Sequence, residues 1–562
     1  MAAPDQDILR TRNALLGGKP AVALHTAKAA VAKAPGTSEP LYWLASALLA
    51  NGDLNGGLQM LNDARLTHGL AVVRGMGGDA KRLTTDADYA LQIGHRLYNA
   101  NYPATASVAL GLAVIAGRDE PQQLVSLALA FLHQGRAVEA NDTFRAVSEM
   151  MPKSAAAQQF ELYSLFMVPD GVARHAVAAK AWAERFETPV STSAQPPEPL
   201  AGRRLRVGYV APTFADGQIR QFMAPLLDHH DAERFEIFLY PHAAGDTPDW
   251  ACAPTIRPIG ELKDDEAAAL VREDRIDVLI DAWGHTSGSR LGIFARRAAP
   301  VQATWLNYQQ TTGLRSMDYA IHSKSILTPG METLFSETVW PVEPISAPFR
   351  ADPAQPSPAP VLATGAVTFG SFINPSKLSA ETIAGWSRLL LAVEDSRLLL
   401  KYRYFEDPLL ARATTARFAA HGIAPERLTF EGHAQGEAYE QAFARIDLSL
   451  DPSPCPGGTT TLEALARGVP VITMRGPTFY SRIGAQLVEG AGLPDLVAES
   501  WDDYVAKAAA VSADPANLQA LRDRTWDGFA KAPFSDEVQV TRTLEKAYLE
   551  MFAAKWPEQA AP

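Results

Sequence analysis

The chemically densest segment of the chain is SPCPGGTTTLEALARGVPVIT, at residues 453–473. An apolar strand pattern precedes it, Gly458 permits a tight turn, and Thr459, Thr460 and Thr461 follow as the predicted cap residues of a helix. The N–H groups at a helix start, together with threonine hydroxyls, can hold the charged oxygens of a diphosphate. The segment therefore predicts a phosphate site, and a capped helix without a ligand is the alternative interpretation.

A carboxylate lies close to this predicted phosphate site. Glu463 follows Thr459 by four residues and is predicted in the first turn of the same helix. There its oxygens could accept hydrogen bonds from the two hydroxyls of a ribose. A phosphate site with a ribose acceptor beside it indicates a nucleotide ligand.

A second candidate segment, GSFINPSKLSAETIAGW, spans residues 370–386. A strand pattern ends at Phe372, the next loop carries Asn374 and Lys377, and a helix is predicted to begin near Ser379. Lys377 would then lie at the carboxyl end of the strand, where its charge could neutralise a departing nucleotide phosphate. A solvated surface lysine is the alternative, because most lysines are exposed.

The third candidate segment is DAWGHTSGSR, at residues 281–290, which again follows a strand pattern. His285 could be a general base, a hydrogen-bond donor to a pyrophosphate or a structural histidine. Asp281 could orient this histidine or act alone. These two residues are the predicted candidates near the reacting centre.

Strand and helix patterns show what must position these segments. Residues 203–351 and 352–562 each alternate β-rich runs with helix-period runs, which predicts two parallel sheets wrapped by helices. The predicted strands are 203–210, 235–241, 276–283, 301–306 and 317–322, then 367–372, 397–403, 427–432, 446–451 and 469–474. Ligands of such sheets bind at the carboxyl ends of the strands. Two adjacent Rossmann-like lobes are the layout of the α/β GT-B fold, and the cleft between them is the expected active site.

The first 190 residues repeat with a period of 34. Gly18 and Gly52 lie 34 residues apart in similar turns, and the same spacing links Asn101, Gly135 and Pro169. Paired helices at this period are typical of tetratricopeptide repeats, whose units stack because no pair can bury its apolar face alone. The sequence thus predicts an all-α TPR-like superhelix.

The repeat arm has two interpretations. One is a concave groove that grips an extended segment of a protein acceptor. The other is a packing scaffold or a surface for forming a homodimer. A linker rich in Ser, Pro and Ala at 191–202 separates the arm from the lobes.

Composition narrows the class of protein. The chain of 562 residues carries a formal net charge of −12, so nucleic acid is a poor candidate partner. Its two cysteines, Cys252 and Cys455, are too few and too far apart for a disulfide scaffold or a cysteine-based metal site. The N-terminal residues show no signal-peptide pattern, and no run of about 18 apolar residues predicts a membrane span. We expect a soluble, cytoplasmic protein.

Together these motifs resemble the O-GlcNAc transferase and SPINDLY family of protein glycosyltransferases. The family's motifs match FINPSKL, PGGTTTLEALARGVPVITM, WLNYQQTTGLRSMDYAI (305–321) and GPTFYSRIGAQLVEGAGL (476–493), the last with Arg482. The resemblance implies an inverting enzyme that transfers a sugar to Ser or Thr and needs no metal or other cofactor. The predicted lobes carry no Asp-x-Asp metal motif, which agrees. It also implies that Asn374, Lys377, Gly458, the three threonines, Glu463 and Arg482 bind the donor.

The sequence departs from the family pattern beside the predicted sugar position. Where the family has a histidine after the first catalytic strand, this chain has Gly217 and Gln218, and the family's Tyr-Pro-Gly becomes Tyr308, Gln309 and Gln310. This pattern is expected when one reaction class accepts a different sugar. UDP-GlcNAc is the family donor. Bacterial FlmG-like flagellin glycosyltransferases suggest a CMP-linked nonulosonic acid such as pseudaminic acid, with flagellin as acceptor, and SPINDLY suggests GDP-fucose.

The alternative hypothesis is that the protein is not an enzyme but a non-catalytic repeat scaffold with a degenerate transferase domain. The missing loop histidine motivates it. The intact phosphate and ribose motifs oppose it.

Overall fold

The computed structural model describes residues 6–16, 19–33, 44, 47, 80–168, 171–187, 196–215, 217–243, 245, 249–351 and 356–560. Three of the five predicted repeat turns, at Gly18, Gly52 and Pro169, lie outside these residues. None of the helices in the described ranges has the length and apolarity needed to cross a bilayer.

The chain divides into two compact units. The first comprises Met1–Met151, Phe372–Ser387 and Leu398–Ala434, and the second Pro152–Ser371, Arg388–Arg397 and Gln435–Pro562. The division follows neither the end of the repeats nor the boundary between the two sheets. The loop that carries Lys377 therefore belongs to the unit that holds most of the repeat arm.

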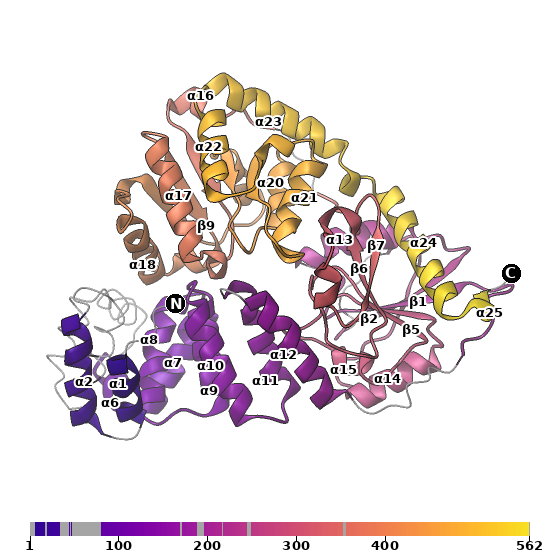
Figure 1. Cartoon of the computed structure of the whole chain (residues 1–562), viewed down its shortest axis with the longest axis horizontal. Coiled ribbons are helices and arrows are strands. Elements are labelled where there is room, and N and C mark those ends of the chain that lie inside the picture. Colours follow the sequence, from indigo (N-terminus) through magenta and orange to yellow (C-terminus); the bar gives the residue numbers. More distant parts are fainter. Residues whose placement is uncertain are drawn as a thin grey trace. The chain divides into compact units, whose positions relative to one another are not determined.

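Helices of the first unit form the described part of this arm (Figure 1). They are α1 (Gln6–Leu16), α2 (Pro20–Lys33), α6 (Ala80–Thr85), α7 (Ala87–Asn99), α8 (Pro103–Ile115), α9 (Pro121–Leu132) and α10 (Ala137–Met150). The α7–α8 turn contains Asn101 at φ 68°, and the α9–α10 turn contains Gly135 at φ 76°. Both turns were predicted, 34 residues apart. Leu97, Leu110 and Leu127 pack in one apolar core between these helices, as stacked pairs require.

The last two repeat helices belong to the second unit. They are α11 (Ala155–Ser164) and α12 (Gly171–Phe186), with the 3₁₀-helix η1 (Leu165–Met167) between them. Leu162 and Trp182 share a core with Tyr240, Leu279 and Phe294 of the first sheet region. The end of the repeat arm is thus part of the fold that follows it.

The first sheet has seven parallel strands in the order β3-β2-β1-β4-β5-β6-β7. The strands are β1 (Leu205–Val210), β2 (Phe235–Tyr240), β3 (Thr255–Ile256), β4 (Val278–Asp281), β5 (Val301–Thr304), β6 (Tyr319–Ser323) and β7 (Thr338–Val342). The connecting helices are α13 (Gly217–His229), α14 (Asp264–Glu273), α15 (Leu291–Phe294) and the short η2 (Lys324–Ile326) and η3 (Met331–Leu334). All five predicted strands are present, and β3 and β7 add the two edges.

The second sheet has six strands in the order β10-β9-β8-β11-β12-β13. They are β8 (Thr368–Ser371), β9 (Arg397–Lys401), β10 (Leu428–Glu431), β11 (Leu448–Leu450), β12 (Val471–Met474) and β13 (Val497–Ala498). The helices are α16 (Val361–Thr364), α17 (Ala380–Ala392), α18 (Pro408–Ala419), α19 (Glu437–Phe443), α20 (Thr459–Leu465), α21 (Ile483–Gly490), α22 (Trp501–Ser512), α23 (Pro515–Ala530), α24 (Glu537–Lys555) and α25 (Pro557–Ala560). The 3₁₀-helices are η4 (Pro375–Lys377), η5 (Arg403–Glu406), η6 (Pro425–Arg427), η7 (Tyr480–Arg482), η8 (Pro494–Leu496) and η9 (Pro533–Ser535). The predicted fold class, a helical region followed by two α/β sheets, is confirmed.

Helix α24 returns to the first sheet, as Figure 1 shows beside α13 and β7. The hydroxyl of Tyr209 donates to that of Tyr548 at 3.1 Å, and Glu545 lies 3.0 Å from Nδ1 of His230. These groups are buried. The end of the chain therefore ties the two sheet regions of the second unit together.

Candidate donor-binding and catalytic site

Asp451 organises the loop that follows β11. Its Oδ1 accepts a hydrogen bond from the backbone N–H of Gly457 at 2.5 Å, and its Oδ2 accepts one from the Thr473 hydroxyl at 2.8 Å. A Cβ atom at position 457 would lie 2.4 Å from Oγ1 of Thr461, so only glycine fits. The buried carboxylate thereby joins β12 to the start of α20.

Helix α20 begins as predicted, but its threonines are not caps. Gly458 occupies the cap position, and among the described residues no side chain caps the helix start. The first three residues of the helix are instead Thr459, Thr460 and Thr461. The hydroxyl of Thr461 lies 3.4 Å from Oδ1 of Asp451, which links the helix start to the end of β11. An uncapped helix start presents backbone N–H groups, which suits an anion.

Two side chains from other parts of the second unit interact with Glu463. The hydroxyl of Tyr439 donates to its Oε2 at 2.7 Å, and the side chain of Gln221 lies close enough to act to lower its pKa. Burial raises the pKa of this carboxyl, while the Tyr439 hydroxyl and Arg467 work in the opposite direction. The carboxylate is oriented but is not fully occupied, since it has about four lone-pair sites.

The loop after β8 lies in the first unit. The side chain of Asn374 accepts a hydrogen bond from the backbone N–H of Ser376 at 3.1 Å and so caps η4, which ends at Lys377. Lys377 is half-buried. Ser379 caps α17 through the N–H of Thr382 at 3.0 Å, at the helix start that the sequence predicted.

Arg482 ends η7 in the second unit. Its Nη1 donates to the carbonyl of Gly476 at 3.3 Å, and its buried Nε has no hydrogen-bond partner among the described residues. Burial lowers the pKa of this guanidinium. A half-buried cation with a spare donor suits an anionic ligand.

Asp281 and His285 are both buried. Asp281 accepts from the N–H groups of Trp283 and Gly284 and from the Thr304 hydroxyl, and burial raises its pKa to about 6. Nε2 of His285 donates to the Thr312 carbonyl at 2.8 Å, and burial lowers its pKa to about 4. Asp281 therefore braces its own loop and does not hydrogen-bond to His285.

Of the three residues predicted beside the sugar, Tyr308 is buried. Its hydroxyl meets Nε2 of His175 from α12, and a Cβ at Gly284 would overlap its ring. Gln309 is half-buried, and its Oε1 accepts from Nδ1 of His322 at 2.9 Å. Gln218 is exposed at the start of α13.

A family model for glycosyl transferase family 41 matches residues 173–339 and 359–544. The chain belongs to glycosyl transferase family 41. The match begins inside α12, which agrees with the packing of this helix in the second unit.

Relatives of this family 41 chain include several plant proteins. A probable UDP-N-acetylglucosamine–peptide N-acetylglucosaminyltransferase SPINDLY from Oryza sativa subsp. japonica is 33% identical over 422 residues, which are 71% of this chain and 45% of the relative. The corresponding SEC protein of Arabidopsis thaliana is 26% identical over 373 residues, 62% of this chain and 37% of the relative. The chain thus spans less than half the length of these curated relatives.

A solved structure covers nearly the whole family 41 chain. A mutant O-GlcNAc transferase from Thermobaculum terrenum is 25% identical, with a TM-score of 0.76, over 99% of this chain and 100% of that one. The order of a helical region and two α/β sheets is therefore shared from end to end.

Several contacts around the site were missed by sequence reasoning. Tyr439 and Gln221 interact with Glu463, and the hydroxyl of Tyr480 lies 2.9 Å from Sγ of Cys455 in the glycine-rich loop. Tyr439 lies 24 residues from Glu463, and Tyr480 lies 25 residues from Cys455, so neither contact is local in the sequence. The sequence of this family 41 member carries no signal that would have found them.

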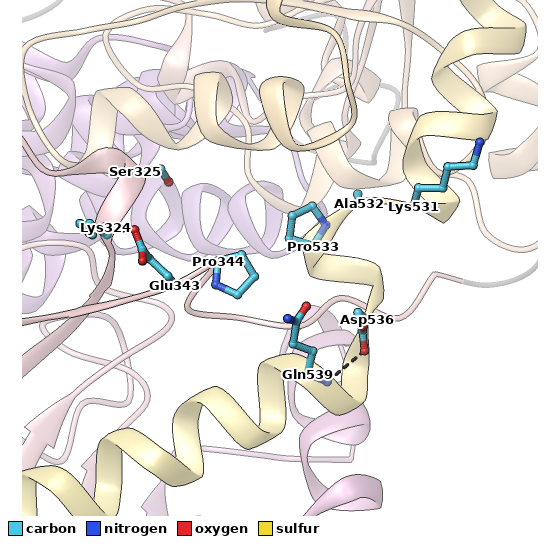
Figure 2. Close-up of a pocket in the computed structure, with 9 residues that line it drawn as sticks. All are labelled: Lys324, Ser325, Glu343, Pro344, Lys531, Ala532, Pro533, Asp536 and Gln539. Carbon is cyan, nitrogen blue, oxygen red and sulfur yellow. Dashed lines mark hydrogen bonds and ion pairs between the residues drawn. The ribbon is translucent and has the colours of Figure 1, made fainter.

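A separate pocket of about 700 Å³ lies away from these residues in the second unit. Figure 2 shows that it is built by η2, the segment after β7 and the segment around η9. Lys324 and Glu343 on its wall already form an ion pair at 3.0 Å. None of the predicted donor-binding residues lines it, and we assign it no ligand.

Proposed function

We propose that this chain transfers a sugar from a nucleotide-sugar donor to a Ser or Thr hydroxyl of a protein, with inversion and without a metal. The observation that carries the proposal is the start of α20, where an uncapped helix is held by Asp451 and followed by an oriented Glu463. This combination suits a nucleoside phosphate. A pure scaffold would have no use for it.

Each predicted donor residue has a proposed task. The N–H groups at the start of α20 receive phosphate oxygens, and Glu463 accepts from the ribose hydroxyls. Lys377 and Arg482 balance the negative charge that grows on the departing phosphate, which takes the place of a divalent cation. Strands β8 and β11 are adjacent and parallel in the second sheet.

The proton of the acceptor hydroxyl needs a base. Burial raises the pKa of Asp281 to about 6, so this carboxylate is ionised at pH 7 and can take a proton. It would have to give up its contacts to Gly284 and Thr304 to reach an acceptor. His285 remains the second candidate, through its unpartnered Nδ1.

UDP-GlcNAc is the first donor to test, because the relatives' names specify UDP-N-acetylglucosamine. Gln309 departs from the family pattern beside the predicted sugar position and is half-buried, which supports testing a second donor. That donor is a CMP-linked nonulosonic acid, pseudaminic acid in particular, with flagellin as acceptor. GDP-fucose is the third.

The repeat arm is proposed to grip the protein acceptor. Its stacked helices share one apolar core, and stacked helix pairs of this kind commonly present a surface for an extended segment. Formation of a homodimer through the same helices is the alternative use of the arm.

The test is a thermal-shift panel of the purified chain with UDP, GDP, CMP and their sugars. A ligand that binds only the folded state raises the melting temperature in proportion to RT ln(1 + [L]/Kd). We expect the largest shift with UDP and its GlcNAc conjugate. A shift with CMP alone would favour the nonulosonic acid, and no shift with any nucleotide would favour the scaffold.

A further inference from the structure

The turn between α9 and α10 lies against the loop that carries Lys377. Both segments belong to the first unit. A Cβ atom built on Gly135 would lie 2.8 Å from the carbonyl oxygen of Pro375 and 3.3 Å from that of Leu378. The repeat backbone therefore touches the donor loop on either side of Lys377, at a distance that only glycine allows.

Arg417 of α18 contacts both the donor loop and the α9–α10 turn. Its Nη2 donates to the carbonyl of Leu378 at 2.6 Å, and its Nη1 would lie 3.4 Å from a Cβ at Gly135. The guanidinium thus joins α18, the donor loop and the repeat turn at one point.

Stacked rings provide a second connection. His133 ends α9 and stacks between Tyr98 of α7 and Tyr404, with a ring separation of 4.5 Å to the latter. Tyr404 packs in turn against Tyr402, whose hydroxyl lies close to the side chain of Asn374. Asn374 is the residue that caps η4. This chain of contacts runs from the repeat helices to the residue that shapes the loop.

A third connection is a buried hydrogen-bond pair. The backbone N–H and the hydroxyl of Thr105, in α8, donate to the two carboxylate oxygens of Asp407 at 2.9 and 2.8 Å. Asp407 also caps α18 through the N–H of Leu409. A repeat helix and a helix of the second sheet region thus share one buried carboxylate.

We propose that the α9–α10 turn is a positioning element for the donor loop 374–378 and that Gly135 is a positioning residue for Lys377. The repeat arm then supports donor binding itself, apart from any grip on the acceptor. The inference rests on the proposed function only in that Lys377 contacts the donor phosphate. The mechanical part, that the turn holds the loop, stands without it.

The chain offers a matched pair of variants. Gly135→Ala places a methyl group against two backbone carbonyls, so the loop or the turn must move. Gly117→Ala introduces the same left-handed strain in the α8–α9 turn, at φ 95°, but its Cβ meets nothing within 4 Å. The difference between the two variants reports the contact with the loop and not the backbone strain.

The measurements are the Kd for UDP, the KM and kcat for the donor, and hydrogen exchange of the amides at 374–378. For Gly135→Ala we expect a loss of donor affinity or turnover on the order of tenfold or more, because small displacements of a positioned group are costly. We also expect faster exchange in the loop. Gly117→Ala should match the wild type in all three.

A second pair covers the case in which Gly135→Ala fails to fold. His133→Ala removes the ring that stacks on Tyr404 without adding a clash, and His95→Ala removes a repeat-arm histidine that bonds only within the arm, to Ser126. We expect a weaker Kd for UDP in the first and not in the second.

Equal exchange at 374–378 and equal UDP binding within each pair would overturn the proposal. If the wild type bound no nucleotide, the proposed function would be wrong. Hydrogen exchange at 374–378 would then be the one measurement that tests whether the turn positions the loop. Faster exchange only in Gly135→Ala would then support the positioning proposal, and equal exchange would overturn it.

Discussion

His175 and Tyr308 show how one buried pair joins two parts of the chain. His175 comes from the last repeat helix, and burial lowers its pKa to about 3. Its Nε2 meets the hydroxyl of Tyr308, in the loop predicted to lie beside the sugar. Phe166 packs against both rings and against Tyr480 of the other sheet region. The imidazole must therefore stay neutral for this cluster to form.

This neutrality makes stability depend on pH. An unfolded histidine binds a proton below about pH 6.5, while folded His175 does not until about pH 3, so the unfolded state takes up more protons as the pH falls. The free energy of unfolding should decrease by up to about 1.4 kcal/mol per pH unit from this residue between pH 6.5 and 4. His175→Gln should show a shallower decrease in urea titrations at several pH values.

The control for this prediction is His95→Gln, a half-buried histidine in the same arm. A change of slope that appears in His175→Gln and not in His95→Gln assigns the pH dependence to His175. Equal slopes for wild type and His175→Gln would contradict the assignment of His175 as a buried neutral base.

At the residue scale, sequence reasoning located the segments but not their contacts. The glycines predicted the turn before α20, because a glycine's conformational freedom acts locally, whereas the predicted threonine caps are absent. The environment of His285 depends on its contacts with Trp182 and Thr312, which come from distant segments. Local pattern could not supply that information.

At the scale of elements, α12 acts as a helix of the catalytic fold. Trp182 is 2% exposed, donates from Nε1 to the Ala155 carbonyl at 3.2 Å and packs edge-on against His285. Val177, on the same helix, is 72% exposed. One helix therefore offers both a core position and a surface position.

Trp182→Ala should lower the free energy of unfolding by about 3–5 kcal/mol, the usual cost of emptying a large core site. Val177→Ala should stay within about 0.5 kcal/mol of the wild type. Chemical denaturation followed by fluorescence or circular dichroism measures both. A small loss for Trp182→Ala would mean that α12 is a separable repeat helix.

The position of α12 also affects how the repeat arm can be removed. A cut at residue 190 would take away α11 and α12 with the core residue Trp182. A cut at Met151, where the second unit begins, keeps both helices. Only the second cut separates the loss of the arm from damage to the first sheet region.

The apolar sequence pattern predicted some strands of the two sheets and missed others. Long apolar runs predicted every central strand, because parallel strands are buried on both faces. The missed strands are edges: β3 and β13 have two residues each, and β7 contains Pro341. Such short or proline-bearing runs carry too little pattern to be recognised.

At the scale of the whole molecule, the compact units cut across the predicted domains. Residues 372–387 and 398–434 form one compact unit with the repeats, and their strands β9 and β10 also belong to the second sheet, in the predicted C-terminal lobe. The cause is tertiary: Thr105, His133 and Gly135 all contact this insertion. Composition and linker patterns indicate the order of segments along the chain. They do not indicate which distant segments come into contact.

We propose that the chain moves a sugar onto protein hydroxyls. The direct measurement is the release of nucleotide from UDP-GlcNAc, GDP-fucose and CMP-pseudaminic acid, with and without acceptor. The acceptors are flagellin and a peptide library rich in Ser and Thr. Intact mass reports the modified acceptor. Lys377→Ala serves as the inactive variant and Lys531→Ala, an exposed lysine of the separate pocket, as its control.

We predict acceptor-dependent release from one donor, UDP-GlcNAc first, with a matching mass gain that is lost when Ser and Thr are replaced by Ala. Lys377→Ala should lower kcat by about 10²-fold or more, since its charge acts mainly as the phosphate departs. Lys531→Ala should behave as wild type. Absence of transfer from all three donors, or full activity of Lys377→Ala, would contradict the proposed chemistry.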